Sequence, residues 1–62
     1  MQKPDNFKYD LGTILKKKSG SEWEGKVVGF YSTEQTPEGY ALEATAYKNT
    51  VQIYPVQALI EA

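Results

Sequence analysis

Short apolar runs separated by turn residues are the dominant pattern of this 62-residue sequence from Thr13 onward. The segment from Thr36 to Gly39 predicts a tight turn, because proline presets φ at about −65° and glycine accepts positive φ. Ser19-Gly20 and Lys48-Asn49 mark two further turns. Short β-type runs with this spacing are typical of a small all-β barrel or sandwich.

Five strands are expected, covering residues 13–18, 23–33, 40–47 and 51–54, with a last strand near Ile60. Pro55 lacks an amide donor, so the fourth strand should end there or lie at a sheet edge. Residues 56–59 predict a short helical or 3₁₀ link. We therefore expect a five-stranded SH3-like barrel over residues 13–62.

Residues 1–12 precede this domain and differ from it in composition. They are mostly polar, are interrupted by Pro4 and show no hydrophobic period. This pattern predicts a flexible N-terminal arm, with Phe7 and Tyr9 as its candidate packing residues.

A single small domain of this length buries only about 60% of its unfolded surface, so its core is thin. The sequence has no Cys and no His, which excludes disulfides and removes the best metal ligands. One Trp, two Phe and five Tyr are more aromatic surface than one small barrel easily hides. Self-association is the remaining way to stabilise such a domain.

The charge balance argues against nucleic acid as a partner. Seven Lys face eight acidic residues and Arg is absent, whereas nucleic-acid binders normally carry a basic excess with Arg. No apolar stretch approaches a membrane span, and the start of the chain lacks the apolar region of a secretion signal. We expect a cytoplasmic protein with no membrane partner.

Residues 51–54 are the most informative stretch for function. Successive side chains of a strand point to opposite faces, so Gln52 and Tyr54 share one side while Val51 and Ile53 share the other. We expect Val51 and Ile53 to fill the core and the two polar side chains to form a site. Without His or Cys the common nucleophilic triads are excluded, and no phosphate-binding glycine loop is present.

Several motifs, in order and at matching spacing, closely resemble the type II dihydrofolate reductases, the plasmid-borne, trimethoprim-insensitive enzymes. The resemblance covers about residues 17–59. The matching segments are Lys17-Lys18-Ser19-Gly20, Trp23, Gly25, Val28-Gly29, Tyr31, Thr36-Pro37-Glu38-Gly39-Tyr40-Ala41, Val51-Gln52-Ile53-Tyr54-Pro55-Val56 and Ala58-Leu59.

The resemblance implies a homotetramer of SH3-like barrels around one central pore, in which NADPH reduces dihydrofolate. Gln52 would contact both the pterin and the nicotinamide, the main chain of Ile53 would bind the nicotinamide carboxamide, and Tyr54 would orient the cofactor. Lys17 would attract the phosphates of NADPH and the glutamate tail of dihydrofolate, and Thr50 occupies a cofactor-contacting position. Gln52, Ile53 and Tyr54 are thus the candidate catalytic residues.

No matched residue can donate the proton that the reaction needs, so the resemblance implies that substrate binds already protonated. Four positions depart from the family pattern. Tyr47 replaces a His whose protonation splits the tetramer, which predicts no histidine-driven dissociation. Phe30 replaces a Trp, Glu22 a small residue and Thr50 a Ser, and each change bears on an interface or on the pore mouth.

Two other functions fit parts of the sequence. An SH3-like interaction module would keep the barrel and bind a protein without catalysis, but the sequence lacks the acidic loop and clustered aromatics typical of proline-rich recognition. A nucleic-acid-binding barrel using Lys16-Lys17-Lys18 is the weakest alternative, given the net charge of −1.

Overall fold

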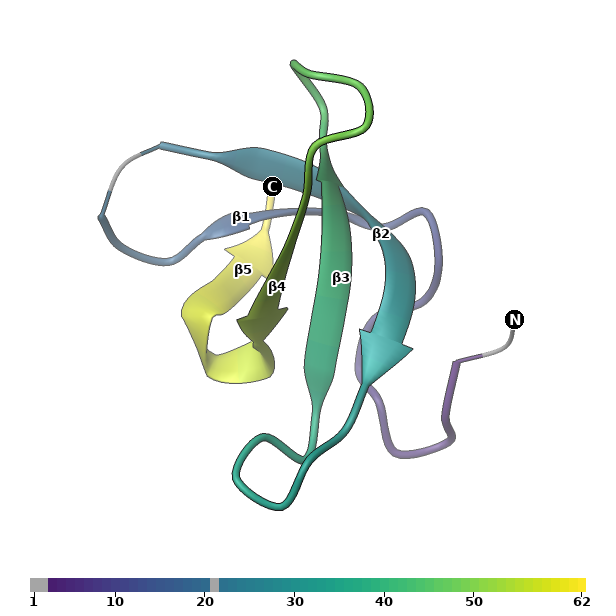
Figure 1. Cartoon of the computed structure of the whole chain (residues 1–62). Helices are drawn as coiled ribbons and strands as arrows, with labels where there is room; N and C mark the ends of the chain where they lie inside the picture. Colours follow the sequence, from purple (N-terminus) through teal and green to yellow (C-terminus); the bar gives the residue numbers. More distant parts are fainter. Residues whose placement is uncertain (1–2, 21) are drawn as a thin grey trace.

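The computed structural model describes residues 3–20 and 22–62, which form one antiparallel five-stranded sheet with no α-helix among them. The strand order is β4-β3-β2-β1-β5 (Figure 1). These results confirm the predicted all-β class and the number of strands. The elements are β1 (Ile14–Lys17), β2 (Glu24–Tyr31), β3 (Gly39–Ala44), β4 (Val51–Pro55), the 3₁₀ helix η1 (Val56–Ala58) and β5 (Leu59–Glu61).

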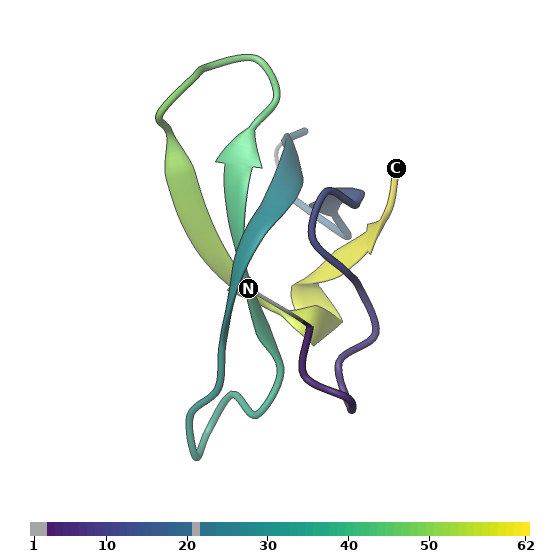
Figure 2. The same cartoon turned by 90° about the vertical axis from the view of Figure 1, so that its right-hand side faces the viewer.

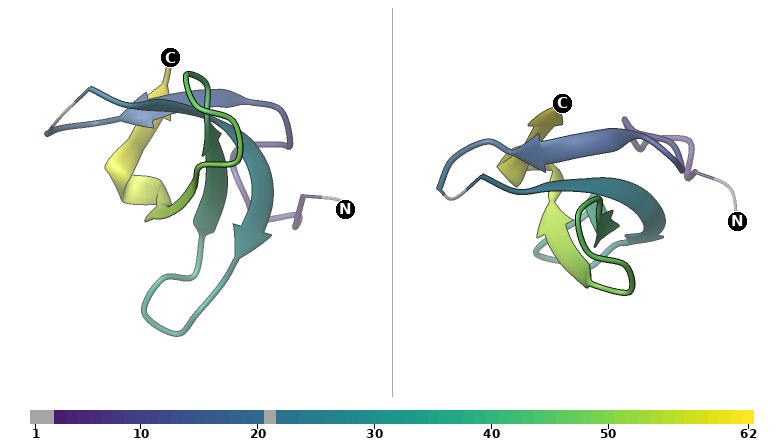
Figure 3. Two further views of the ribbon diagram at one scale, coloured as in Figure 1. Left: turned by 45° about the horizontal axis from the view of Figure 1, so that its top comes forward. Right: turned by 90° about the horizontal axis from the view of Figure 1, so that it is seen from above.

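The sheet curls on itself but does not close, which corrects the closed barrel expected from the sequence (Figure 3). Within the described residues, β4 pairs only with β3 and β5 pairs only with β1, so these two strands are the edges. The chain passes from one edge to the other through η1, directly after Pro55. Because Pro55 has no amide hydrogen, β4 loses a donor where it would approach β5.

The turns follow the chemistry of their residues. Gly20 has φ of +90° and Asn49 has φ of 65°, which are left-handed values that these residue types accept most readily. In the turn between β2 and β3, the Thr33 amide donates to the Thr36 carbonyl and the Thr36 amide donates to the Thr33 hydroxyl, both at 2.8 Å. The turns predicted at Ser19-Gly20 and Lys48-Asn49 are present, and the chain also bends at Pro37 and Glu38, but Gly39 begins β3 and does not adopt the positive φ expected of it.

A β-bulge interrupts the pairing of β2 with β3. The register shifts between Val27, which pairs with Leu42, and Gly29, which pairs with Ala41. Val28 is the extra residue, and it is exposed whereas Val27 is buried. A bulge increases the local twist, and β2 bends strongly in Figure 1.

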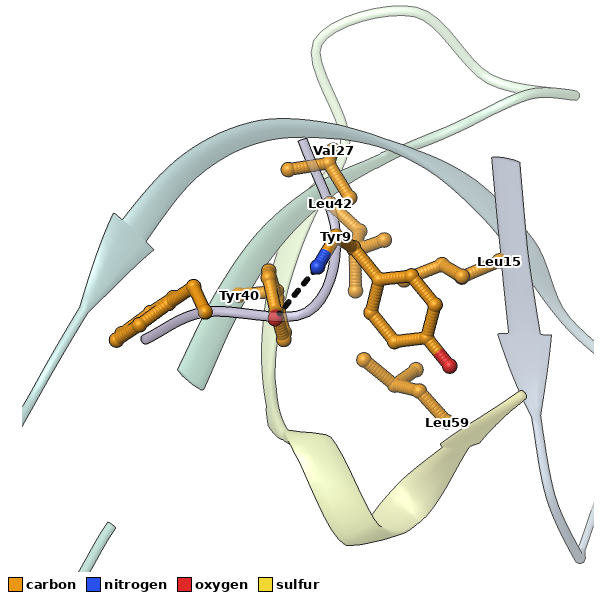
Figure 4. Close-up of a cluster of buried hydrophobic side chains, with 7 residues drawn as sticks. Tyr9, Leu15, Val27, Tyr40, Leu42 and Leu59 are labelled. Atoms are coloured by element: carbon orange, nitrogen blue, oxygen red, sulfur yellow. Dashed lines mark hydrogen bonds between the residues drawn. The ribbon is translucent and has the colours of Figure 1, made fainter. Parts of the chain in front are cut away.

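The core lies on the inner side of the curled sheet and draws on every strand except β4. Tyr40, Leu15 and Leu42 are fully enclosed, and the Tyr40 ring meets neighbouring rings edge to face (Figure 4). Partly buried side chains, including Tyr54 of β4, pack against this cluster. The cluster consists of Phe7, Tyr9, Leu15, Val27, Tyr40, Leu42 and Leu59.

The N-terminal segment contributes directly to this core. Phe7 and Tyr9 keep only 4% and 6% of their surface exposed. Figure 2 shows the segment on the same side of the sheet as β5, facing β3 and β4. The packing of Phe7 and Tyr9 considered from the sequence is thus observed, and the division into an arm over residues 1–12 and a barrel over residues 13–62 stays a prediction.

The Tyr40 phenol should make stability fall at alkaline pH. Burial, reinforced by the hydrogen bond to Glu38, raises the pKa of Tyr40 from 10.0 to about 12. The folded protein therefore favours the neutral phenol. The contribution of this phenol to the free energy of unfolding is complete below the pKa that Tyr40 has in the unfolded chain, and it is lost as pH rises through the pKa in the folded protein.

We expect the free energy of unfolding of the native chain to fall over this window more steeply than that of Tyr40→Phe. Denaturant titrations across about pH 10–12 measure the two slopes. Equal slopes would mean that Tyr40 does not link stability to pH.

Within the described residues, no helix has the length and apolar content needed to cross a lipid bilayer.

Candidate functional site

β4 is an edge strand, and this determines what its backbone can do. Its only partner is β3, with Ile53 opposite Ala41 at the centre of the register. An edge strand keeps one row of amide and carbonyl groups free for another strand or for a ligand. Main-chain binding by β4, which the resemblance assigns to Ile53, is therefore chemically available on this strand.

The two faces of β4 are the reverse of those expected from the sequence. Val51 and Ile53 are 53% and 64% exposed, whereas Gln52 and Tyr54 are half-buried. Cross-strand partners point to the same face, and the partner of Tyr54 is the enclosed Tyr40. The prediction that Val51 and Ile53 fill the core is wrong. Gln52 and Tyr54 lie opposite the enclosed Leu42 and Tyr40, so they take the inner face and leave the outer face to Val51 and Ile53.

Tyr54 brings three of the predicted site residues together. Its hydroxyl donates to the Oε1 atom of Gln52, and the Nζ atom of Lys17 lies 5.9 Å from the centre of its ring. This separation is within the range of a cation–π contact. The Trp23 ring lies 5.5 Å from the Tyr54 ring, tilted by 55°. We call Lys17, Trp23, Gln52 and Tyr54 the Tyr54 cluster.

Thr50 lies outside the Tyr54 cluster, at the end of the loop between β3 and β4. Its carbonyl accepts a hydrogen bond of 2.8 Å from the Ala44 amide, which closes that loop. The Thr50 side chain is exposed. A ligand contact by Thr50 therefore requires a molecule that extends along β4 beyond the Tyr54 cluster.

Trp23 supports the site, although the sequence reasoning gave it no role there. Its carbonyl accepts from the Lys17 amide at 3.2 Å, while its ring reaches Tyr54. The ring crosses Gly25 so closely that a Cβ there would lie 2.7 Å from it and 3.0 Å from Leu42. The spacing Trp23-x-Gly25 was the available signal in the sequence.

An open hollow of about 660 Å³ lies beside the Tyr54 cluster rather than over it. It shares Lys17 and Trp23 with the cluster, but Gln52 and Tyr54 are not among its lining residues. Tyr47, which is 70% exposed, and Glu22 line it as well, so two of the four departures from the family pattern meet here. This hollow of the described residues therefore does not extend over Gln52 and Tyr54.

Phe30, another departure, lies on the other side of the core. It is half-buried and packs edge to face on Phe7 at 5.7 Å and on Tyr40 at 6.0 Å. Phe30 thus serves the packing of the N-terminal segment within the subunit.

The cluster is suited to binding and orientation rather than to acid–base catalysis. It offers an ammonium group, an amide, an indole and a phenol, with no carboxylate, imidazole or thiol. Among residues 3–20 and 22–62, no group of three or more potential metal ligands comes together. The chemistry that this set of groups can supply is the binding and orientation of a ligand.

The chain is similar to known proteins over nearly its whole length. A family described as R67 dihydrofolate reductase matches residues 1–62. Two curated relatives from Escherichia coli, each named Dihydrofolate reductase type 2, are 52% identical over 56 residues, which cover 90% of this chain and 72% of each relative. These matches confirm the resemblance read from the motifs and the assignment to a family of oxidoreductases. The chain is a member of the R67 dihydrofolate reductase family.

Proposed function

We propose that this protein reduces 7,8-dihydrofolate to tetrahydrofolate with NADPH, in a pore shared by four subunits and without inhibition by trimethoprim. The observation that carries the proposal is the Tyr54 cluster on an edge strand, in a chain of the R67 dihydrofolate reductase family. The relatives named Dihydrofolate reductase type 2 supply the reaction class.

Assembly is part of the proposal because the subunit is incomplete in two respects. First, the hollow does not cover Gln52 and Tyr54. Second, the outer side of the sheet carries an exposed apolar face, made of Val28, Val51 and Ile53 beside the half-buried Ala41. Symmetric contact between such faces would bury apolar side chains and bring several β4 strands to one cavity.

The residues of β4 and Lys17 have the chemistry that a dinucleotide needs. The ammonium of Lys17 would attract phosphates, the Gln52 amide and the Ile53 main chain would bind the carboxamide, and the Tyr54 ring would give a flat surface. The Thr50 hydroxyl would add a contact further along the cofactor. NADPH supplies the hydride when bound.

The role of the protein would then be to hold the pterin beside the nicotinamide. Orientation of this kind can lower a barrier by about 7–11 kcal/mol in well-aligned systems. Lys17 would also bind the glutamate tail of dihydrofolate and so draw both ligands to one mouth of the pore. No residue of the cluster would transfer the proton, which the substrate would bring from solution.

The rate of reduction should therefore rise steadily as pH falls. A substrate that must be protonated before it binds becomes more abundant at lower pH. Since no protein base takes part, the rate should not fall again when such a base would become protonated. Steady-state rates at saturating NADPH measure this dependence. A bell-shaped profile centred near neutrality would indicate a protein acid or base and contradict the proposed mechanism.

The direct test combines mass with activity. Sedimentation should give the mass of four subunits at neutral and at mildly acidic pH, because Tyr47 replaces the family's titrating His. NADPH absorbance should decrease when dihydrofolate is added and should do so equally in trimethoprim. A monomer without activity would instead favour the non-catalytic SH3-like interaction module.

Lys17→Met should weaken binding of both ligands and reduce the dependence of binding on salt. The substitution keeps the length of the side chain and removes the charge that lies over the Tyr54 ring. Lys16→Met is the matched control, since Lys16 is exposed on the same strand and its side chain points to the opposite face. Calorimetric titration with NADPH at low and high salt gives the comparison. Equal effects of the two substitutions would remove Lys17 from the site.

A further inference from the structure

Residues 7–9 form a strap that packs across the core, bends at Lys8 and does not pair in the sheet. Phe7 and Tyr9 place their rings edge to face on Tyr40, at 5.5 and 5.4 Å between ring centres. Figure 4 shows the Tyr9 backbone nitrogen directed at the Tyr40 oxygen. The strap is therefore docked on one residue of β3, the strand between β4 and β2.

The Tyr40 hydroxyl is the polar centre of this docking. It accepts hydrogen bonds from the amides of Lys8 and Tyr9, both at 3.0 Å, and it donates to the Oε2 atom of Glu38. The same carboxylate oxygen accepts from the Lys8 amide at 2.8 Å. One phenol and one carboxylate thus satisfy two amides of a segment that has no partner strand.

The segment that holds the strap also holds the end of β4. Tyr40 pairs directly with Tyr54 in the register of β3 and β4, and their side chains share the inner face. The carbonyl of Glu38 accepts from the Val56 amide at 3.0 Å, two residues beyond Tyr54. The backbone at Tyr54 and two residues beyond it is therefore fixed to residues that the strap contacts.

We propose that Tyr40 is a positioning residue, which uses the docked strap to fix Tyr54 and, through it, the amide of Gln52. The Tyr54 hydroxyl holds Oε1 of Gln52, which leaves the amide nitrogen of Gln52 directed to other partners. When the strap is undocked, the side chains of Glu38 and Tyr40 lose the hydrogen bonds that fix them beneath β4, and the Tyr54 ring moves relative to Trp23. The consequence for catalysis rests on the proposed function, whereas the geometric coupling does not.

The test compares Tyr40→Phe with Tyr9→Phe in the full chain. Both remove one phenol oxygen from the same aromatic cluster, but the described hydrogen bonds of the strap use the hydroxyl of Tyr40 and only the amide of Tyr9. Trp23 is the only tryptophan, so its emission reports the contact with Tyr54 without any ligand. The side-chain amide resonances of Gln52 give a second ligand-free readout.

In Tyr40→Phe we expect a changed Trp23 emission, shifted Gln52 amide resonances and a several-fold rise in KM for both ligands, with a smaller change in kcat. Tyr9→Phe should match the native protein in its Trp23 emission, Gln52 amide resonances, KM and kcat. Should Tyr40→Phe fail to fold, Glu38→Gln serves instead. It keeps the Tyr40 ring and weakens the hydrogen bonds that Glu38 accepts from Tyr40 and Lys8.

A variant that lowers only the unfolding midpoint, with native emission, resonances and KM, would overturn the inference and make the strap merely structural. Absence of reductase activity in the native protein would reject the proposed function alone, because the two ligand-free readouts still decide whether the strap positions Tyr54.

Discussion

Replacing Val28 with glutamate is expected to dissociate the proposed tetramer and abolish reduction of dihydrofolate, while each subunit stays folded. Val28 is the exposed extra residue of the β2 bulge and part of the exposed apolar face. Burying an unpaired carboxylate between subunits costs several kcal/mol, and a cost of about 4 kcal/mol weakens association about a thousandfold. Sedimentation, NADPH oxidation and far-ultraviolet circular dichroism measure the three parts of this result.

Gln35→Glu is the matched control for Val28→Glu. It adds the same charge at an exposed position in the turn between β2 and β3, away from the exposed apolar face. We expect it to keep native mass and activity. Retention of four subunits and full activity by Val28→Glu would show that this face is not the contact between subunits.

Leu42→Ala should cause the largest loss of stability among substitutions outside the candidate site. Leu42 is completely enclosed on β3, opposite Val27 on one side and Gln52 on the other. Removing a buried leucine to leave a cavity costs about 2–5 kcal/mol. A domain of this length has a free energy of unfolding of only about 3–9 kcal/mol, so the substitution should remove about half of it.

Denaturant titration of Leu42→Ala beside Leu42→Met measures this loss. Methionine nearly conserves the side-chain volume and should cost less than about 1.5 kcal/mol. A similar, small loss in both variants would mean that β3 can relax around the missing atoms and that the core is less tightly packed than its burial indicates.

Most of the strands could be predicted because the turns between them depend on local chemistry. Gly20 and Asn49 adopt the positive φ that their residue types favour, and the chain bends at Pro37, whereas Gly39 begins β3 without a positive φ. The third strand, expected over residues 40–47, is shorter than predicted because β3 ends at Ala44. Pro55 likewise ended β4 within the predicted limits. The motif containing Gln52 and Tyr54 identified the family for the same reason, since it is a contiguous pattern.

The orientation of β4 could not be predicted, because alternation defines two faces without stating which one is inside. The choice depends on Tyr40 and Leu42, which lie across the strand pair, and on Phe7 and Tyr9 from the distant strap. The role of Trp23 depended in the same way on Gly25 leaving room for its ring. Contacts between segments far apart in sequence decide these features, and no short window contains them.

The docking of the strap also sets an order for the formation of the native state. The hydrogen bonds from Lys8 and Tyr9 to Glu38 and Tyr40 span 30 to 32 positions, about half of the chain. Contacts of such separation slow folding, because a long loop must close before they form. During synthesis Phe7 and Tyr9 leave the ribosome before β3 does, so this segment must wait for a strand made later and is among the last parts of the domain to become ordered.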